Sequence, residues 1–256
     1  MKELYVMIKK ELREIMRTKN GMILGITLLF FAIADPVILK MTPMLLKEFS
    51  GVDMSEFIVL SHKAAVVNFY GDVYQIFTIV FVLILSNNWI KEVKEQTFVI
   101  PVLKGASIDK LFLSKVIAYS MVLSTLLIMG FGLNYYYAGV IFGFELELGL
   151  VVYMAILLSL FYGWCTMFIL FISTFIRNQV IVALISLMTL FVGPFLFSLI
   201  KLTEITPFTL IDHASTLTYI PSDQIIVSGL SIIALTFAMY YAGVTIVKRK
   251  EIVKYR

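Results

Sequence analysis

Long uncharged stretches alternate with short charged ones along most of the chain. Six of the uncharged stretches are long enough to cross a membrane, because a helix rises about 1.5 Å per residue and the hydrocarbon core is about 30 Å thick. They lack the strict polar and apolar alternation of a membrane-spanning strand. We therefore predict an all-α polytopic membrane protein with a single transmembrane domain, 1–256, and spans at about 21–39, 68–90, 116–140, 149–174, 179–200 and 225–247.

The segment before the first span has an amphipathic pattern instead. Within Lys2–Thr18, apolar residues recur at three- and four-residue spacing, namely Leu4, Ile8, Leu12, Ile15 and Met16. The charged residues fall on other faces and are Lys9, Lys10, Glu11, Arg13, Glu14 and Arg17. We expect a helix lying on the membrane surface with its apolar side down, followed by a bend over Thr18–Gly21 into the first span. The alternative is a cytoplasmic extension of that span.

Composition places the chain in a membrane. Of its 256 residues, 60% are hydrophobic and 15% are charged, whereas a soluble domain is about 45 to 50% apolar and about 25% charged. The single cysteine, Cys165, lies in an apolar stretch, which excludes a disulfide framework and a multi-thiolate metal site. We expect no cleavable signal peptide, because a long charged segment precedes the first apolar stretch.

Basic residues gather on one side of the predicted membrane. The segments before the first span, between the second and third, between the fourth and fifth, and after the sixth hold 6, 5, 1 and 5 of the 21 Lys and Arg residues. The other three loops hold 3, 0 and 1. By the positive-inside rule, both termini are expected in the cytoplasm. The basic blocks adjoin apolar spans, which favours contact with anionic lipid headgroups over nucleic-acid binding.

The most informative cytoplasmic segment lies between the second and third spans. Pro101 and Gly105 interrupt any continuous helix there, and Ser107 is a suitable N-cap for a new one, with Asp109 in its first turn. Three apolar residues fall on one side of this short helix, namely Ile108, Leu111 and Phe112. Such an apolar knob suits insertion into the groove of a partner protein. The alternative is a loop that rests on the lipid headgroups.

The sequence lacks two common motifs of enzymes, a phosphate-binding loop and a histidine metal motif. None of the 14 glycines is followed directly by lysine, so the chain lacks the phosphate-binding loop of the Gly-Lys-Ser/Thr type. The only histidines are His62 and His213, and neither belongs to a His-Glu-x-x-His metal motif. We expect no catalytic residue, no metal and no cofactor in this chain.

Asp35 is the one carboxylate well inside an apolar stretch. A charged group in a span is costly and usually faces protein or water, which makes Asp35 a candidate residue of a transport pathway. The adjacent Pro36 instead favours a helix end near the headgroups, where a carboxylate costs little. Of these two interpretations, we prefer a carboxylate at a helix end over a residue of the transport pathway.

These features resemble the permease subunits of type-2 ATP-binding-cassette (ABC) transporters, mostly exporters, over nearly the whole chain. The resemblance rests on the amphipathic segment Lys9–Arg17, on six spans with both ends inside, and on the segment Glu92–Lys115. In that family, the segment that corresponds to Glu92–Lys115 has an acidic and basic stretch, a Gly-Thr pair, a Pro about four residues later, and a short helix that ends in Lys.

The chain matches that family pattern in part. Glu92, Thr97, Pro101 and Lys115 agree with it. Three departures stand against them: Gln96 replaces the glycine, Lys94 replaces a usual acidic residue, and Ser107–Lys110 lacks the arginine often found there.

The resemblance implies a pore completed by a second permease chain and driven by two copies of a separate ATPase subunit, which would hold ATP and Mg²⁺. It implies the plasma membrane of a prokaryote and contact with lipid. Lys2–Thr18 would be the elbow helix, Ser107–Leu113 the coupling helix seated on the ATPase, and Thr206–Leu217 the extracellular gate. The residues assigned to ATPase coupling are Glu92, Thr97, Ser107, Ile108, Asp109, Lys110, Leu111 and Phe112, and those assigned to the gate are Pro207, Phe208 and Ile211.

The expected function is therefore export of a hydrophobic or amphipathic cargo, such as a peptide, an antibiotic or a lipid-like molecule. An ion-driven secondary transporter is the first alternative, and it would need several charges or broken helices inside the membrane. An intramembrane protease would need paired carboxylates or histidines within the spans. A non-transporting immunity or sensor protein is the last alternative, and the spans alone do not distinguish it.

Overall fold

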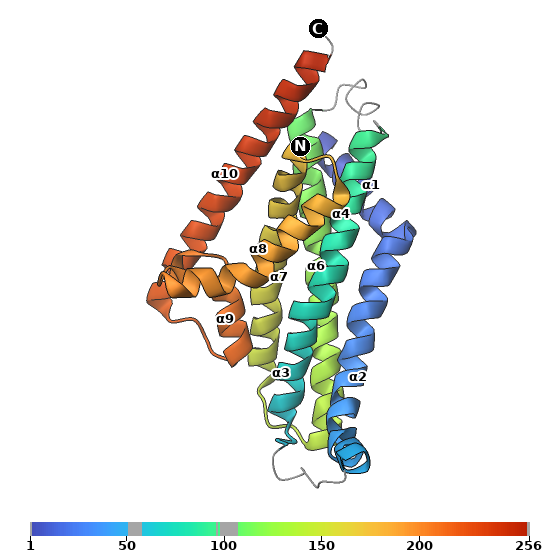
Figure 1. Ribbon diagram of the computed structural model, residues 1–256, viewed down its shortest axis with the longest axis vertical. Helices are drawn as coiled ribbons and strands as arrows, with labels where there is room; N and C mark the ends of the chain where they lie inside the picture. Colours follow the sequence, from blue (N-terminus) through green and yellow to red (C-terminus); the bar gives the residue numbers. More distant parts are fainter. Residues whose placement is uncertain (1, 51–57, 96, 98–106, 255–256) are drawn as a thin grey trace.

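The computed structural model describes residues 2–50, 58–95, 97 and 107–254 (Figure 1). Every regular element in this part of the chain is helical. In chain order these are α1 (Lys2–Arg17), α2 (Lys19–Ser50), α3 (His62–Asp72), the π-helical turn η2 (Val73–Phe77), α4 (Thr78–Lys94), α6 (Ile108–Phe142), α7 (Leu148–Phe175), α8 (Gln179–Leu199), the 3-10 turn η3 (Thr203–Ile205), α9 (Phe208–Thr216) and α10 (Ser222–Lys254).

Six helices in the described residues are long and apolar enough to cross a membrane, which confirms the prediction of a six-helix polytopic architecture. They cover 19–49, 62–92, 108–142, 148–175, 179–199 and 226–248. The second of them is built from α3, η2 and α4 in continuous succession. Both α2 and α6 extend well past their predicted ends, because helical hydrogen bonding continues through the polar residues that flank the apolar stretch.

The helices form an elongated bundle (Figure 1). We call its two ends the terminal end, which carries both chain termini, and the distal end, where α6 passes into α7 (Figure 1). The most buried span is α7, which packs against α6 along its length, and the least buried is α10. The outward faces of α8 and α10 are apolar, with Met188 and Phe237 as exposed examples. Such faces are suited to contact with lipid or another apolar helix.

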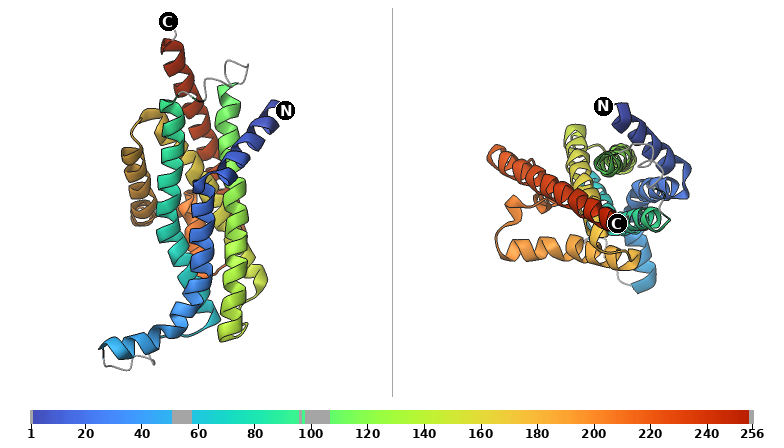
Figure 2. Two further views of the ribbon diagram at one scale, coloured as in Figure 1. Left: turned by 90° about the vertical axis from the view of Figure 1, so that its right-hand side faces the viewer. Right: turned by 90° about the horizontal axis from the view of Figure 1, so that it is seen from above.

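The amphipathic segment forms a separate helix, α1, and not an extension of the first span. Thr18 closes it by donating its N–H to the carbonyl of Glu14 at 2.9 Å. A Cβ atom on Gly21 would lie 2.1 Å from the carbonyl oxygen of Ile15, so this tight bend requires glycine. Figure 2 shows α1 turned away from the axis of α2 and crossing α6.

At two of the prolines inside spans, Pro36 and Pro194, a side chain from another helix repairs the interrupted backbone hydrogen bond. A proline has no N–H, so it leaves the carbonyl four residues earlier without its helical donor. Pro36 frees the carbonyl of Ala32, which accepts a hydrogen bond from Asn134 Nδ2 at 3.2 Å. Pro194 frees the carbonyl of Leu190, which accepts one from the Tyr74 hydroxyl at 2.6 Å. Helix α2 therefore continues past Pro36, where the sequence predicts a helix end.

The segment between α8 and α10 folds back against the bundle. Figure 1 places α9 at mid-height, well short of the distal end. The Tyr70 hydroxyl donates to the carbonyl of Ile211 at 3.0 Å, and the N–H of Ile220 donates to the Tyr153 hydroxyl at 3.2 Å. Irregular backbone at membrane depth needs protein partners of this kind.

The repair of Pro194 by Tyr74 predicts a specific coupling between the two residues. Tyr74→Phe should lower the midpoint of thermal unfolding in detergent, because the Leu190 carbonyl loses its donor at a cost of about 1–3 kcal/mol. In a Pro194→Ala background the helix supplies its own N–H, so the same change should have a much smaller effect. Equal effects of Tyr74→Phe in both backgrounds would contradict this explanation.

Candidate functional site

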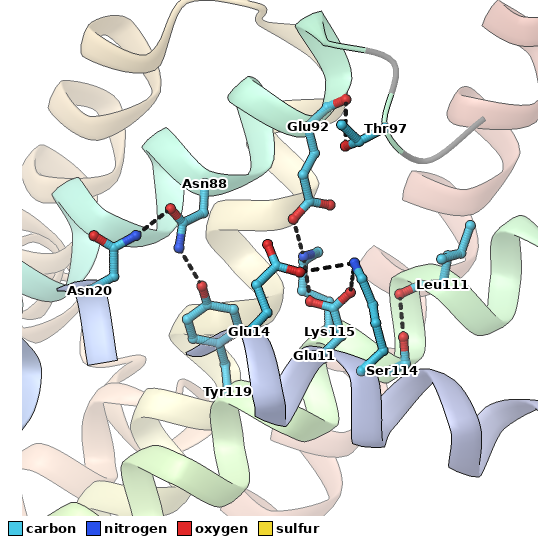
Figure 3. Close-up of polar contacts among 11 residues, drawn as sticks. Glu11, Glu14, Asn20, Asn88, Glu92, Thr97, Leu111, Ser114, Lys115 and Tyr119 are labelled. Carbon is cyan, nitrogen blue, oxygen red and sulfur yellow. Dashed lines mark hydrogen bonds and ion pairs between the residues drawn. The ribbon is translucent and has the colours of Figure 1, made fainter. Parts of the chain in front are cut away.

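The most distinctive polar site of the described residues lies at the terminal end, where α1 crosses α4 and α6. We call it the ion cluster, and it consists of Lys10, Glu11, Glu14, Glu92 and Lys115. Lys115 Nζ lies 2.6 Å from Glu11 Oε2 and 2.6 Å from Glu92 Oε1 (Figure 3). The side chains of Lys115 and Glu11 are only 3% and 2% exposed. One ammonium group therefore joins three elements in a buried position.

The local sequence of α1 explains how Glu11 reaches this site. Met7, Glu11 and Ile15 are the buried residues of α1 and follow one another at four-residue spacing, on the face that meets α6. The sequence places Glu11 on a solvated face, and this expectation is wrong because Lys115 provides a buried counter-charge. Lys115 is also covered by Trp89 of α4, whose ring centroid lies 5.9 Å from Nζ.

The two ammonium groups keep Glu11 ionised. Burial by itself raises the pKa of this carboxyl, but the charges of Lys115 and Lys10 outweigh it and hold the pKa below its ordinary value of 4.5. Lys10 Nζ lies 2.9 Å from Glu11 Oε1 and 3.0 Å from Glu14 Oε2. Carboxylate oxygens of Glu11, Glu14 and Glu92 also come within 4.8 Å of one another, a spacing that suits a metal ion. Lysine ammonium groups already contact all three carboxylates, so the described geometry favours ion pairing over metal binding.

A second polar chain runs beside the ion cluster. Asn20 Nδ2 donates to Asn88 Oδ1 at 2.7 Å, and Asn88 Nδ2 donates to the Tyr119 hydroxyl at 2.6 Å (Figure 3). These three residues belong to α2, α4 and α6. The start of the first span is therefore tied to the same two helices that α1 contacts through Lys115.

The beginning of α6 also holds two exposed ion pairs. Lys110 pairs with Glu3 of α1, and the hydrogen bond from Lys110 lowers the pKa of the Glu3 carboxyl. Lys248 Nζ of α10 lies 2.8 Å from Asp109 Oδ1. Exposed pairs of this kind are screened by solvent and salt and add little to stability. They still place Asp109 and Lys110 between α1 and α10.

The residues expected to contact an ATPase lie at the start of α6 and not on a separate short helix. Ser107 precedes α6 as its predicted N-cap residue, although its hydroxyl makes no capping hydrogen bond. Phe112 is buried, with ring centroids 5.5 Å from Trp89 and 6.2 Å from Tyr240, so it is not the exposed knob that the sequence predicts. Two of the expected apolar contacts remain half-buried, Ile108 and Leu111.

The earlier part of this segment is described only in part. Thr97 is exposed and donates its N–H to the carbonyl of Glu92 at 3.2 Å. Pro101 lies outside the described residues. The basic residues Lys9, Lys10, Arg13 and Arg17, expected on the elbow helix, are all exposed on α1, and Lys10 also pairs with Glu11 in the ion cluster.

The residues expected to form an extracellular gate are packed into the chain. Pro207, Phe208 and Ile211 are all buried. The ring of Phe208 lies 5.9 Å from that of Trp164 and 5.7 Å from that of Phe197, measured between centroids. Helix α9 is therefore held by aromatic contacts with both α7 and α8.

Asp35 does not lie at a helix end, because α2 continues to Ser50. Its side chain is 5% exposed, and its Oδ2 atom has no hydrogen-bond partner among the described residues. Asp72 is the last residue of α3 and lies within the second span. The two carboxylates line the same cavity.

Neither the partnership of Glu11 with Lys115 nor that of Asp35 with Asp72 was predicted from the sequence. Two sequence features could have indicated them. Glu11 lies at four-residue spacing from apolar Met7 and Ile15, and Asp72 lies directly before an apolar stretch. A comparison of the chain with protein-family models gave no match, and a comparison with curated proteins also gave none.

The ion cluster predicts a large difference between two lysines of α6. Lys115→Met leaves Glu11 and Glu92 buried without their shared counter-ion, and breaking a buried pair in this way costs about 3–5 kcal/mol. Lys110→Met removes only an exposed pair and serves as the matched control. Thermal unfolding in detergent should show a large decrease for the first variant and little change for the second, and equal midpoints would contradict the assignment.

The lowered pKa of Glu11 predicts an acid-sensitive contribution to stability. The unfolded chain takes up a proton near pH 4.5, before the folded chain does, so the contribution is complete above that pH and is lost as the pH falls through the folded-state pKa. The difference in unfolding midpoint between wild type and Glu11→Gln should therefore shrink below about pH 4.5. A difference that stays constant from pH 7 to pH 3.5 would show that Glu11 is not held ionised.

Proposed function

We propose that the chain is the membrane-spanning permease subunit of an ATP-driven exporter of the type-2 ABC class. It forms a translocation pathway with a second permease chain and is driven by two copies of a separate ATPase subunit. The cargo is hydrophobic or amphipathic. The terminal end faces the cytoplasm, in line with its excess of Lys and Arg.

The observation that carries this proposal is the position of Lys115. In the chain, α4 ends at Lys94 and α6 begins at Ile108, so the segment 95–107 connects the two helices. Lys115 of α6 binds Glu92 of α4, so it joins the two helices that flank this segment. It also binds Glu11 of α1. A force applied to the segment from the cytoplasm therefore reaches the surface helix and two spans together.

The start of α6 supplies a second route for such a force. Ile108 and Leu111 are half-buried and remain available in part to a partner. One turn deeper, Phe112 packs against Trp89 of α4 and Tyr240 of α10. A partner seated on the first turn of α6 therefore acts on α4 and α10 through side chains that are already in contact.

An ion-driven secondary transporter is the second candidate. It is favoured by Asp35 and Asp72 in one cavity and by η2, the π-helical turn that follows Asp72 within the span. It leaves the ion cluster without a functional role, because such a transporter needs no cytoplasmic motor. The ATP-driven proposal uses both the ion cluster and the surface helix, and we prefer it for that reason.

A charge on the first turn of α6 provides the test. In a complex of this chain with its ATPase, Ile108→Glu should reduce cargo-stimulated ATP hydrolysis and transport at least tenfold, because a carboxylate in an apolar contact loses its hydration. Leu148→Glu makes a similar change at the first residue of α7, at the distal end, and should leave the stimulation within twofold of wild type. The proposal is wrong if Ile108→Glu transports cargo like wild type in a complex that remains assembled.

A further inference from the structure

A cavity of about 330 Å³ opens between α2 and the succession of α3 and η2. Asp35, Thr42, Asn68, Asp72 and Gln75 form its polar lining. Asp35 lies 14 residues after Gly21, or about 21 Å along the helix axis, so it falls within a hydrocarbon core about 30 Å thick and nearer to the distal side. The cavity therefore holds Asp35 at a depth where water is scarce.

The cavity carries negative charge without a basic partner. Asp35 is 95% buried, Asp72 is the charged group that interacts with it, and Asp35 Oδ2 lacks a hydrogen-bond partner among the described residues. The nearest lysines in sequence, Lys40 and Lys63, are exposed and do not line the cavity. His62 is occupied elsewhere, by the Tyr135 carbonyl and the N–H groups of residues 145 and 146.

The helices packed behind the cavity add no compensating charge. Residues 116–142 of α6 include no Asp, Glu, Lys, Arg or His, and the same is true of residues 73–90. Acidic groups inside a membrane normally have a cationic partner or a role in transport. Because the described residues that line the cavity include no Lys, Arg or His, the missing partner is expected to come from a ligand.

Size and lining indicate which kind of cation fits. A volume of about 330 Å³ is in the range of small-molecule sites and far exceeds a bare metal ion. Ile38, Leu39 and Val67 line another part of the cavity and offer apolar surface beside the carboxylates. A carboxylate pair next to aliphatic side chains is complementary to an ammonium group that bears alkyl substituents.

We infer that the cavity between α2 and α3 binds the ammonium group of an amphipathic organic cation through Asp35 and Asp72. The binding requires no ATPase and is independent of the function proposed above. One consequence does rest on that function: if the chain is an exporter, cationic amphiphiles are its cargo class.

Equilibrium binding of radiolabelled hexyltrimethylammonium to the full chain alone, in dodecyl maltoside micelles at pH 7.5, tests the inference. Asp35→Asn and Asp72→Asn should each weaken binding at least tenfold. Asp212→Asn removes an exposed carboxylate of α9, outside the cavity, and should stay within twofold of wild type. Asp35→Asn should unfold at the same temperature as wild type or higher, because a neutral amide avoids placing a second buried charge beside Asp72.

Competition decides between an organic cation and other occupants. The neutral analogue with carbon in place of nitrogen should not displace the probe, and millimolar CaCl₂ or NaCl should displace little of it. Full displacement by calcium or sodium at these concentrations would overturn the inference in favour of a metal site, and displacement by the neutral analogue would show that charge is not recognised. Loss of ATPase coupling in Ile108→Glu leaves this assay unchanged, so the two proposals fail separately.

Discussion

The structure depends on one constraint: inside a bilayer, each polar group must find its partner within the protein. At Pro36 and Pro194 neighbouring helices satisfy it, since Asn134 donates to the carbonyl freed by Pro36 and Tyr74 donates to the carbonyl freed by Pro194. These repairs connect α6 to α2 and η2 to α8. The constraint therefore fixes which helices are neighbours, in addition to keeping each one helical.

The same constraint organises the terminal end, where charges are buried. Lys115 is almost inaccessible, and its two carboxylate partners come from α1 and α4. Packing alone allows helices to slide past one another, whereas a buried ammonium with two carboxylates has one favourable arrangement. The ion cluster thus gives the surface helix a defined position on the bundle. Asp35 departs from this constraint, because its Oδ2 atom has no hydrogen-bond partner among the described residues and the residues lining its cavity include no Lys, Arg or His.

Much of the fold was predictable from the sequence, because hydrocarbon thickness and helix rise translate directly into the length of an apolar stretch. The amphipathic helix and its bend at Gly21 were predictable for a similar reason. The prediction of a helix end at Pro36 was wrong, because a proline stops a helix only if nothing replaces the missing hydrogen bond. The replacement donor, Asn134, lies 102 residues from the freed carbonyl of Ala32 in the chain. Only the packing of α6 against α2 identifies Asn134 as this donor.

The candidate sites were predictable only in outline. Glu92 and Lys115 were singled out, but not as partners, and the salt bridge of Lys115 with Glu11 depends on the crossing of α1 over α6, which no local pattern encodes. Phe112 has the spacing of an exposed knob, yet it is buried because α10 returns beside α6 and covers it with Tyr240. Likewise, Asp72 joins Asp35 only because α3 packs against α2.

The central claim is that movement of these helices is powered by a second kind of subunit. Native mass spectrometry of the complex isolated from its own membrane through a tag on this chain measures this directly. The account predicts an assembly of two permease chains and two copies of a protein that carries a phosphate-binding loop. A chain isolated without any such protein, and still able to move cargo in vesicles without ATP, would contradict it.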